Sequence, residues 1–310
     1  IGFAYIPAGN LTLLITLRLL HGVAFGAGNT ALVASVQSVI PHTRRAEGNG
    51  YFATATTLST ALGPFVAVML SQTYGFSMVF VLSALLGVAG AIAGWFFTVK
   101  EREPSPEERA DLRSWRLGTF ISREALPLSV TIGIGGFAYS VVLSFLTVHA
   151  ESLGIPEAAS GYFVAYAISS LLARMFAGRI QDRYGDNSVV YPSLVCFVIG
   201  MALLWWGTTT PVFLSAGILL GLGFGSLLPA LLAAVVNRST PSKVGVVTST
   251  FYLVLDLGSG TGPIVFGAVA TALGFGHMFG VAATLPVVMA AMYVMVHGRY
   301  SHASVGVRGD

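Results

Sequence analysis

Long runs without a charged residue are the feature that most limits what this chain can fold into. The chain has 16 basic and 13 acidic residues among 310, or 9%, whereas soluble domains carry about 25%. Twelve of these charged residues lie between Lys100 and Glu124. A helix needs roughly 20 consecutive apolar residues to cross a bilayer core. The pattern therefore predicts an all-α integral membrane protein and excludes an ordinary soluble protein.

Nine apolar runs are predicted to be transmembrane helices. They cover residues 11–35, 48–70, 76–98, 127–150, 157–178, 189–208, 211–236, 244–270 and 274–297. Alternate connections between them hold fourteen of the sixteen cations, and the opposite connections hold none. Because Lys and Arg collect in cytoplasmic loops, the basic connections and the C-terminus are predicted to be cytoplasmic.

The charged stretch also predicts how the chain is divided. We expect a partial N-terminal bundle over residues 1–98, a cytoplasmic linker over 99–126, a six-helix C-terminal bundle over 127–297 and a cytoplasmic tail over 298–310. The basic residues form no continuous patch, so nucleic-acid binding is not expected. The single cysteine, Cys196, lies in an apolar run and excludes an intrachain disulfide and a paired-cysteine metal or redox site.

An internal repeat links the two bundles at a constant offset of 199 residues. It aligns Gly22 with Gly221, Gly26 with Gly225, Gly63-Pro64 with Gly262-Pro263, and Gly75 with Gly274. Parallel repeats of this kind occur in transporters. Residues 127–199 have no partner in the first half, so we expect nine of twelve spans, with the first three missing. A natural nine-span protein is the alternative.

The fifth span ends in a turn that resembles the G-x-x-x-D-R-x-G signature of the major facilitator superfamily. Here the signature residues are Gly178, Asp182, Arg183 and Gly185. The resemblance implies a gating turn, in which a carboxylate and an arginine join two helices in one state and release them in another. A basic cytoplasmic loop without such a role is the alternative. The chain departs from the family by continuing with Asp186-Asn187 instead of basic residues.

Two further stretches carry the same resemblance. Arg18 to Gly26 is similar to the family's R-x-x-x-G-x-x-x-G pattern, and ionisable groups inside a membrane are candidates for function. Arg18 and His21 are therefore candidates for proton or substrate coupling, and a snorkelling arginine and a hydrogen-bonded interior histidine are the alternatives. Gly63-Pro64 resembles the Gly-Pro motif of the antiporter branch, although a plain helix kink is the alternative because Gly262-Pro263 repeats it.

Asp256 is the only carboxylate predicted near the middle of a span. Burial favours reversible protonation of such a group, so Asp256 is a candidate for the coupling proton, and a packing aspartate is the alternative. Asn29, Tyr139 and Ser144 are candidates for lining a central cavity. Polar side chains in spans also serve as contacts between helices.

The resemblance as a whole is to bacterial proton-coupled exporters of drugs, sugars or small metabolites. It implies a monomer in the cytoplasmic (inner) membrane that exports a small molecule in exchange for protons by alternating access. The alternative is a non-transporting membrane scaffold or an inactive remnant. The sequence has no ATP-binding P-loop pattern and no paired catalytic groups. No enzyme activity, cofactor or metal is therefore expected, and the predicted partners are a small-molecule substrate, protons and lipid.

Overall fold

The computed structural model describes residues 4, 10–96, 121–240 and 243–299. Within these residues the regular structure is helical throughout, which confirms the all-α class. Eight segments of the described chain are long and apolar enough to cross a membrane. The predicted span 48–70 lies within the helix Arg45–Tyr74, which is not among these eight segments.

The helices follow the predicted spans closely. The first three are α1 (Leu11–Val39), α2 (Arg45–Tyr74) and α3 (Phe76–Trp95), with a short 3-10 turn, η2 (His42–Arg44), before α2. The later helices are α6 (Leu126–Ser152), α7 (Glu157–Tyr184), α8 (Asn187–Trp206), α9 (Thr210–Leu222), α10 (Phe224–Asn237), α11 (Val244–Leu273) and α12 (Phe275–Tyr293). A π-helical turn, η4 (Val294–Gly298), extends α12.

Glycines set three of the turns between these helices. Gly75, Gly185 and Gly274 have φ of 82°, 85° and 83°, a backbone conformation that only glycine adopts without strain. Each therefore ends one helix and starts the next within one or two residues. The first and third of these turns are the pair aligned by the sequence repeat. The bounds of α2 and α11 fall at the same offset of 199 residues, as do the first residues of α3 and α12.

One predicted span is not a continuous helix. The run 211–236 was predicted as one segment, but the structure divides it into α9 and α10 at Gly223, where φ is −78° and ψ is −91°. A Cβ atom at Gly223 would lie 2.7 Å from the backbone nitrogen of Phe197 on α8. The break therefore lies where the chain passes close to α8.

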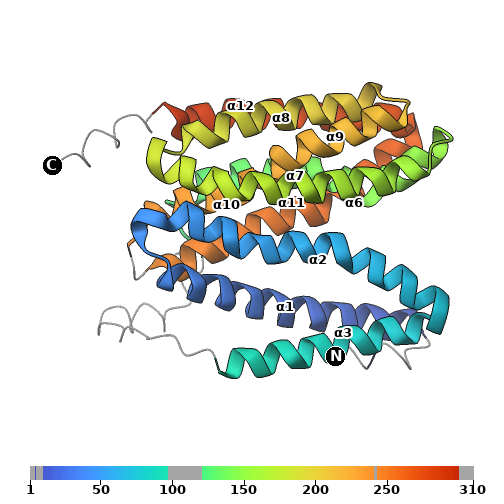
Figure 1. The fold of residues 1–310 in the computed structure, drawn as a ribbon, viewed down its shortest axis with the longest axis horizontal. Coiled ribbons are helices and arrows are strands. Elements are labelled where there is room, and N and C mark those ends of the chain that lie inside the picture. Colours follow the sequence, from blue (N-terminus) through green and yellow to red (C-terminus); the bar gives the residue numbers. More distant parts are fainter. Residues whose placement is uncertain (1–3, 5–9, 97–120, 241–242, 300–310) are drawn as a thin grey trace.

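The helices form two units that lie side by side (Figure 1). The six-span unit of α6 to α12 contains most of the buried core, with Phe197, Phe213, Phe251 and Phe279 among its fully buried side chains. Small residues bring its helices close together: a Cβ at Gly258 of α11 would lie 2.2 Å from the carbonyl oxygen of Gly133 on α6. Such close backbone approach is typical of membrane helices.

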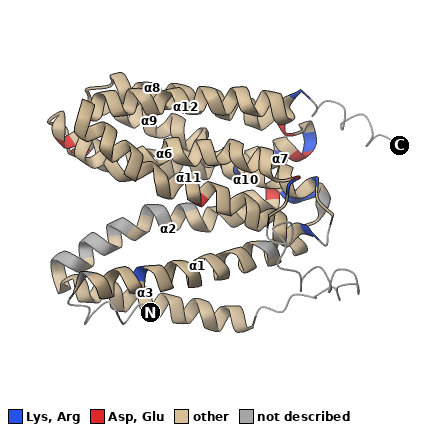
Figure 2. Cartoon of the chain, turned by 180° about the vertical axis from the view of Figure 1, so that it is seen from behind, with Lys and Arg blue, Asp and Glu red and all other residues tan. Residues whose placement is uncertain are grey.

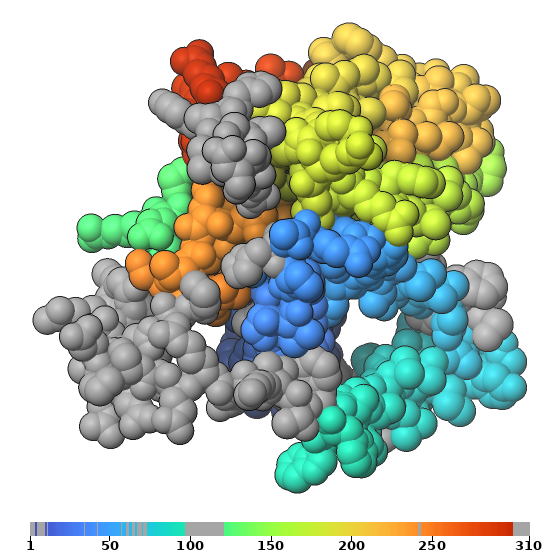
Figure 3. Space-filling model, turned by 60° about the vertical axis from the view of Figure 1, so that its left-hand side comes forward, coloured from blue at the N-terminus to red at the C-terminus, as the bar shows by residue number. Residues whose placement is uncertain are grey.

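The three-helix unit of α1, α2 and α3 is more open. Figure 3 shows a gap between α2 and α3, next to the compact six-span unit. The two units meet mainly where α2 packs against α7 and α10 and where α1 packs against α11. The position of α2 between the units decides where the candidate site forms.

Candidate functional site

Most of the charged residues in the described part of the chain lie at one end of the bundle (Figure 2). This end holds the turn between α7 and α8, the start of α2 and the end of α10. We call it the signature end, because it contains the signature turn of residues 178–185. The charge pattern of the loops predicts that it is cytoplasmic.

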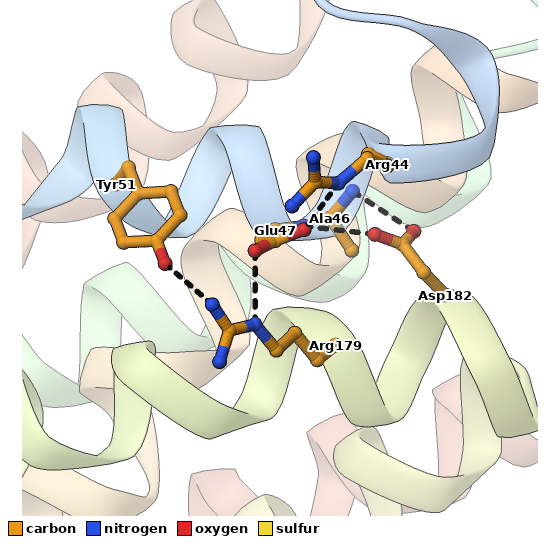
Figure 4. A network of polar contacts seen from close by, with 6 residues as sticks. All are labelled: Arg44, Ala46, Glu47, Tyr51, Arg179 and Asp182. Carbon is orange, nitrogen blue, oxygen red and sulfur yellow. Dashed lines mark hydrogen bonds and ion pairs between the residues drawn. The ribbon is translucent and has the colours of Figure 1, made fainter.

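Asp182 joins the two units at the signature end. Its Oδ1 accepts a hydrogen bond from the backbone N–H of Ala46 at 3.1 Å, and its Oδ2 accepts one from that of Glu47 at 3.0 Å. The first N–H groups of a helix have no partner within the helix, and the positive end of the helix dipole favours an anion there. Asp182 on α7 therefore caps the N-terminus of α2 (Figure 4).

Gly178 makes this cap possible by allowing α7 and α2 to approach. A Cβ atom at position 178 would lie 2.4 Å from the Cα of Glu47 and 2.7 Å from the carbonyl oxygen of Ala46. Any side chain would force the helices apart. Gly185 ends α7 with a positive φ and starts the turn into α8.

Glu47 forms two ion pairs beside this contact, one within its own unit and one with α7. Its carboxylate accepts hydrogen bonds from Nε of Arg44 at 2.7 Å and from Nε of Arg179 at 2.9 Å. Hydrogen bonds from Arg44 and Arg179 lower the pKa of Glu47 to about 2. Arg179 also donates to the hydroxyl of Tyr51 at 3.1 Å. We call Arg44, Ala46, Glu47, Tyr51, Arg179 and Asp182 the Asp182 cluster (Figure 4).

The backbone bonds of Asp182 carry more weight than the ion pairs. The side chains of Arg44 and Arg179 are 67% and 59% exposed, and exposed ion pairs contribute ~0–1 kcal/mol each. The bonds of Asp182 are charge-assisted and satisfy orphan donors of α2, so they are the stronger type. A further bond, from Nη1 of Arg45 to the carbonyl oxygen of Val236 in α10, lies nearby at 3.3 Å.

The predicted partner in the signature, Arg183, lies apart from the cluster. It is exposed, and its guanidinium carbon lies 5.3 Å from the centre of the Tyr184 ring. Among the described residues of α7, the guanidinium that forms an ion pair with α2 belongs to Arg179. Arg44, Arg45, Glu47, Tyr51 and Arg179 were not predicted as site residues. The available signal was the pair Arg44-Arg45 followed by Glu47, one of few acids in the chain, at the start of a span.

Asp186 and Asn187, the residues that depart from the family signature, belong to a second polar cluster. Asp186 accepts hydrogen bonds from Nε2 of Gln181 at 2.8 Å and lies 2.8 Å from Nε2 of His297 at the end of η4. Asn187 donates to the carbonyl oxygen of Gly298 and accepts from the hydroxyl of Tyr293, both at 2.8 Å. Asp186 and Asn187 therefore connect the end of α12, through hydrogen bonds, to the turn between α7 and α8.

The ionisation of Asp186 fits this role. Burial alone would raise the pKa of Asp186, but the hydrogen bonds from His297 and Gln181 outweigh burial and hold the pKa below its ordinary value. His297 is buried, with 1% of its surface exposed. The carboxylate is thus charged at neutral pH and held by two donors.

The predicted coupling residues lie on two helices that pack together. Arg18 is exposed and His21 is half-buried on α1, and Asp256 is exposed on α11. Neither helix brings these groups into the Asp182 cluster. Their coupling roles stay predictions.

The two Gly-Pro pairs have different surroundings. Gly262 packs against α6, because a Cβ there would lie 1.9 Å from Oγ of Ser140, whereas a Cβ at Gly63 would meet nothing within 4 Å. Pro263 lies inside α11, which continues past it. The helix α2 also continues through Gly63 and Pro64, and the side chain of Pro64 lies outside the described part of the structure.

The three predicted cavity residues also differ in position. Tyr139 is buried and stacks on Phe224 and Tyr166, with ring centroids 4.5 and 5.4 Å apart. Ser144 is exposed on α6, and Asn29 is half-buried on α1. Tyr139 is thus part of an aromatic stack inside the six-span unit.

Two helical units joined by polar contacts at one end are an arrangement found in membrane transport proteins that are built from repeats. The family model described as "Major Facilitator Superfamily" matches residues 1–169 and residues 128–309. The chain therefore belongs to the Major Facilitator Superfamily. At the level of the family it is a multi-pass membrane transporter and not an enzyme.

Curated relatives and a solved structure agree with this assignment. The "Multi-drug resistance efflux pump PmrA" of Streptococcus pneumoniae is 27% identical over 310 residues, covering 96% of this chain and 75% of that protein. An uncharacterized MFS-type transporter of Methanocaldococcus jannaschii is 25% identical over 284 residues, covering 89% and 72%. The crystal structure of the human organic anion transporter MFSD10 has a TM-score of 0.72 at 19% identity, covering 94% and 73%. That likeness shows the same fold.

Proposed function

We propose that this chain is a secondary transporter of the bacterial cytoplasmic membrane that exports a small organic compound in exchange for protons. The proposal is supported by membership of the superfamily and by similarity to proteins named as multidrug efflux pumps. We further propose that the structure is the state closed at the signature end, with that end and the C-terminus in the cytoplasm.

The distribution of buried residues along α2 carries this proposal. Nine of the ten positions from 45 to 54 are buried or half-buried, whereas every described side chain from 55 to 63 is exposed. The polar bonds between α2 and the six-span unit come from the same first part of α2. The two units are therefore held together at one end and diverge beyond it, as a rocking transporter in one of its two states requires.

The chemistry of the Asp182 cluster suits repeated opening and closing. Its bonds are polar and partly exposed, so water replaces the protein partners when the units separate, and the net cost of exchange is small. The carboxylate of Glu47 is ionised throughout the physiological pH range because its pKa is about 2. We therefore assign the coupling proton to another group, and Asp256 is the candidate within a span.

Export of a dye from everted membrane vesicles tests the function. We would express the complete reading frame, impose a proton gradient and follow accumulation of Hoechst 33342 by fluorescence. Gradient-dependent accumulation that collapses with nigericin is expected for the wild type. Asp256→Asn should abolish it at unchanged expression, and Asp256→Glu should retain part of it, because only a titratable group can carry the proton.

A matched control is Glu151→Gln, which removes an exposed carboxylate at the opposite end of the bundle and should leave accumulation unchanged. Proton-driven export by Asp256→Asn at the wild-type rate would assign the coupling proton elsewhere. The alternative function, a membrane scaffold that transports nothing, predicts no gradient-dependent movement of any dye by the folded protein.

A further inference from the structure

A buried arginine two turns before Asp182 connects three helices. Arg174 of α7 has 9% of its surface exposed. Its Nε and Nη2 both donate to the carbonyl oxygen of Gly225 on α10, at 3.3 and 3.2 Å. Its Nη1 donates to the carbonyl oxygen of Ala53 on α2. One side chain therefore bonds to backbone in both helical units.

The sequence of α10 explains why the carbonyl of Gly225 is available. In a continuous helix that oxygen would accept the N–H of the residue four positions later, but this residue is Pro229, which has no N–H. Two N–H groups of the planar guanidinium fork donate to this oxygen in place of the one missing N–H. Gly225 also lets α7 approach, because a Cβ there would lie 2.3 Å from Oγ of Ser170.

A small cavity lies beside the guanidinium and is lined by both units. Its walls are Ala46 and Gly50 of α2, Arg174, Ala177, Gly178 and Gln181 of α7, and Ser226, Pro229 and Ala230 of α10. Oγ of Ser226 is buried and has no hydrogen-bond partner among the described residues. Separation of α2 from α7 and α10 would remove one wall of this cavity.

We propose that Arg174 is a positioning residue of the transport cycle that favours the state closed at the signature end. The inference rests on the proposed alternating-access function. The two bonds to Gly225 lie within the six-span unit and persist when α2 moves away, whereas the bond to Ala53 breaks. The guanidinium therefore stays in place between cycles, and closure does not require ordering a long, mobile side chain again.

Cysteine accessibility measures this effect without a substrate. The reporter is Ala230→Cys, at a buried position of the cavity wall, in a Cys196→Ala background of the complete reading frame. Everted vesicles expose the predicted cytoplasmic end to a membrane-impermeant maleimide. We expect Arg174→Gln to raise the alkylation rate about tenfold, as loss of one hydrogen bond to a charged group implies. Arg174→Lys should give a smaller rise, because an ammonium group lacks the planar fork.

Pro229→Ala separates a positioning role from a structural one. Alanine supplies an N–H for the Gly225 carbonyl, so it competes with the guanidinium and should itself raise the alkylation rate. Arg174→Gln should then add less in the Pro229→Ala background than in the wild type. If Arg174 were purely structural, Arg174→Gln would lower the thermal midpoint equally in both backgrounds. Its effect on the alkylation rate would then not depend on Pro229→Ala.

The control is Arg238→Gln, which removes an exposed arginine at the end of α10 and should leave the alkylation rate unchanged. Alkylation within about twofold of wild type in both Arg174 variants, or full additivity with Pro229→Ala, would overturn the proposal. Dye export by the wild type together with unchanged alkylation would reject the role of Arg174 alone. Raised alkylation in a protein that exports nothing would reject the transport function and leave the closing contact standing.

Discussion

At the scale of single residues, the contact between the two units depends most on one carboxylate. Asp182 reaches two backbone N–H groups of α2 with its two oxygens. An amide side chain has a single acceptor oxygen and no charge to offset the helix dipole. The interface at the signature end is therefore more sensitive to Asp182 than to the exposed arginines around it.

We predict that Asp182→Asn opens the signature end. The alkylation rate of the Ala230→Cys reporter should rise about tenfold, because one bond and the charge are lost, and Asp182→Glu should give a smaller increase. Glu124→Gln serves as the control, because Glu124 pairs with Lys243 at the surface, where both side chains are more than half exposed. If the Ala230→Cys reporter is alkylated no faster in the Asp182→Asn variant than in this control, the capping role is contradicted.

A second residue-scale prediction concerns pH. Glu47 has a folded-state pKa lowered from 4.5 to about 2, so its stabilising effect is fully present above about pH 4.5 and is lost as the pH falls toward 2. Alkylation of the reporter should therefore show no step assignable to Glu47 between about pH 5 and pH 8. Glu47→Gln should raise the rate by a constant factor across that range. A factor that varies with pH in this window would show that Glu47 titrates there.

At the scale of elements, the end of α12 is fastened by the residues that depart from the family signature. We predict that Asp186→Asn lowers the thermal midpoint in detergent, because loss of a buried hydrogen-bonded partner costs ~1–3 kcal/mol. His297→Gln should have a similar effect, and the double variant should cost less than the two changes added together, since both remove one contact. Additive costs would show that the two residues act independently.

The sequence predicts the elements better than the contacts between them. Apolar run lengths predicted the spans, because they depend on local composition, and the 199-residue repeat aligned Gly75 with Gly274, which the structure places in the turns before α3 and α12. The break at Gly223 was missed, since glycine is common in these spans and nothing in the local sequence distinguishes this one. The signature predicted Asp182, but its partners on α2 lie about 135 positions away.

Arg174 illustrates a second limit of the sequence. It is a cation inside a span, so its position alone marks it as unusual. Its partners, however, are backbone carbonyl groups, which every residue has. The one local clue is that Pro229 follows Gly225 by four residues, and this clue has meaning only after α7 and α10 are placed together.

At the scale of the whole molecule, the two units contact each other at one end and diverge toward the other. Under alternating access, closing one end opens the opposite end, so that a reporter at each end must respond in opposite directions. Ala230 of α10 lies in the wall of the closed interface. Ser144 is exposed in the second half of α6. These two positions are therefore a natural pair for testing the whole cycle.

The most direct test is the alkylation of Ala230→Cys and Ser144→Cys, each in a Cys196→Ala background, with and without Hoechst 33342 under a proton gradient. Everted vesicles report the first position and right-side-out vesicles the second. The account predicts that the dye raises alkylation at Ala230→Cys and lowers it at Ser144→Cys. Changes in the same direction at both positions, or no change at either while the dye is exported, would contradict it.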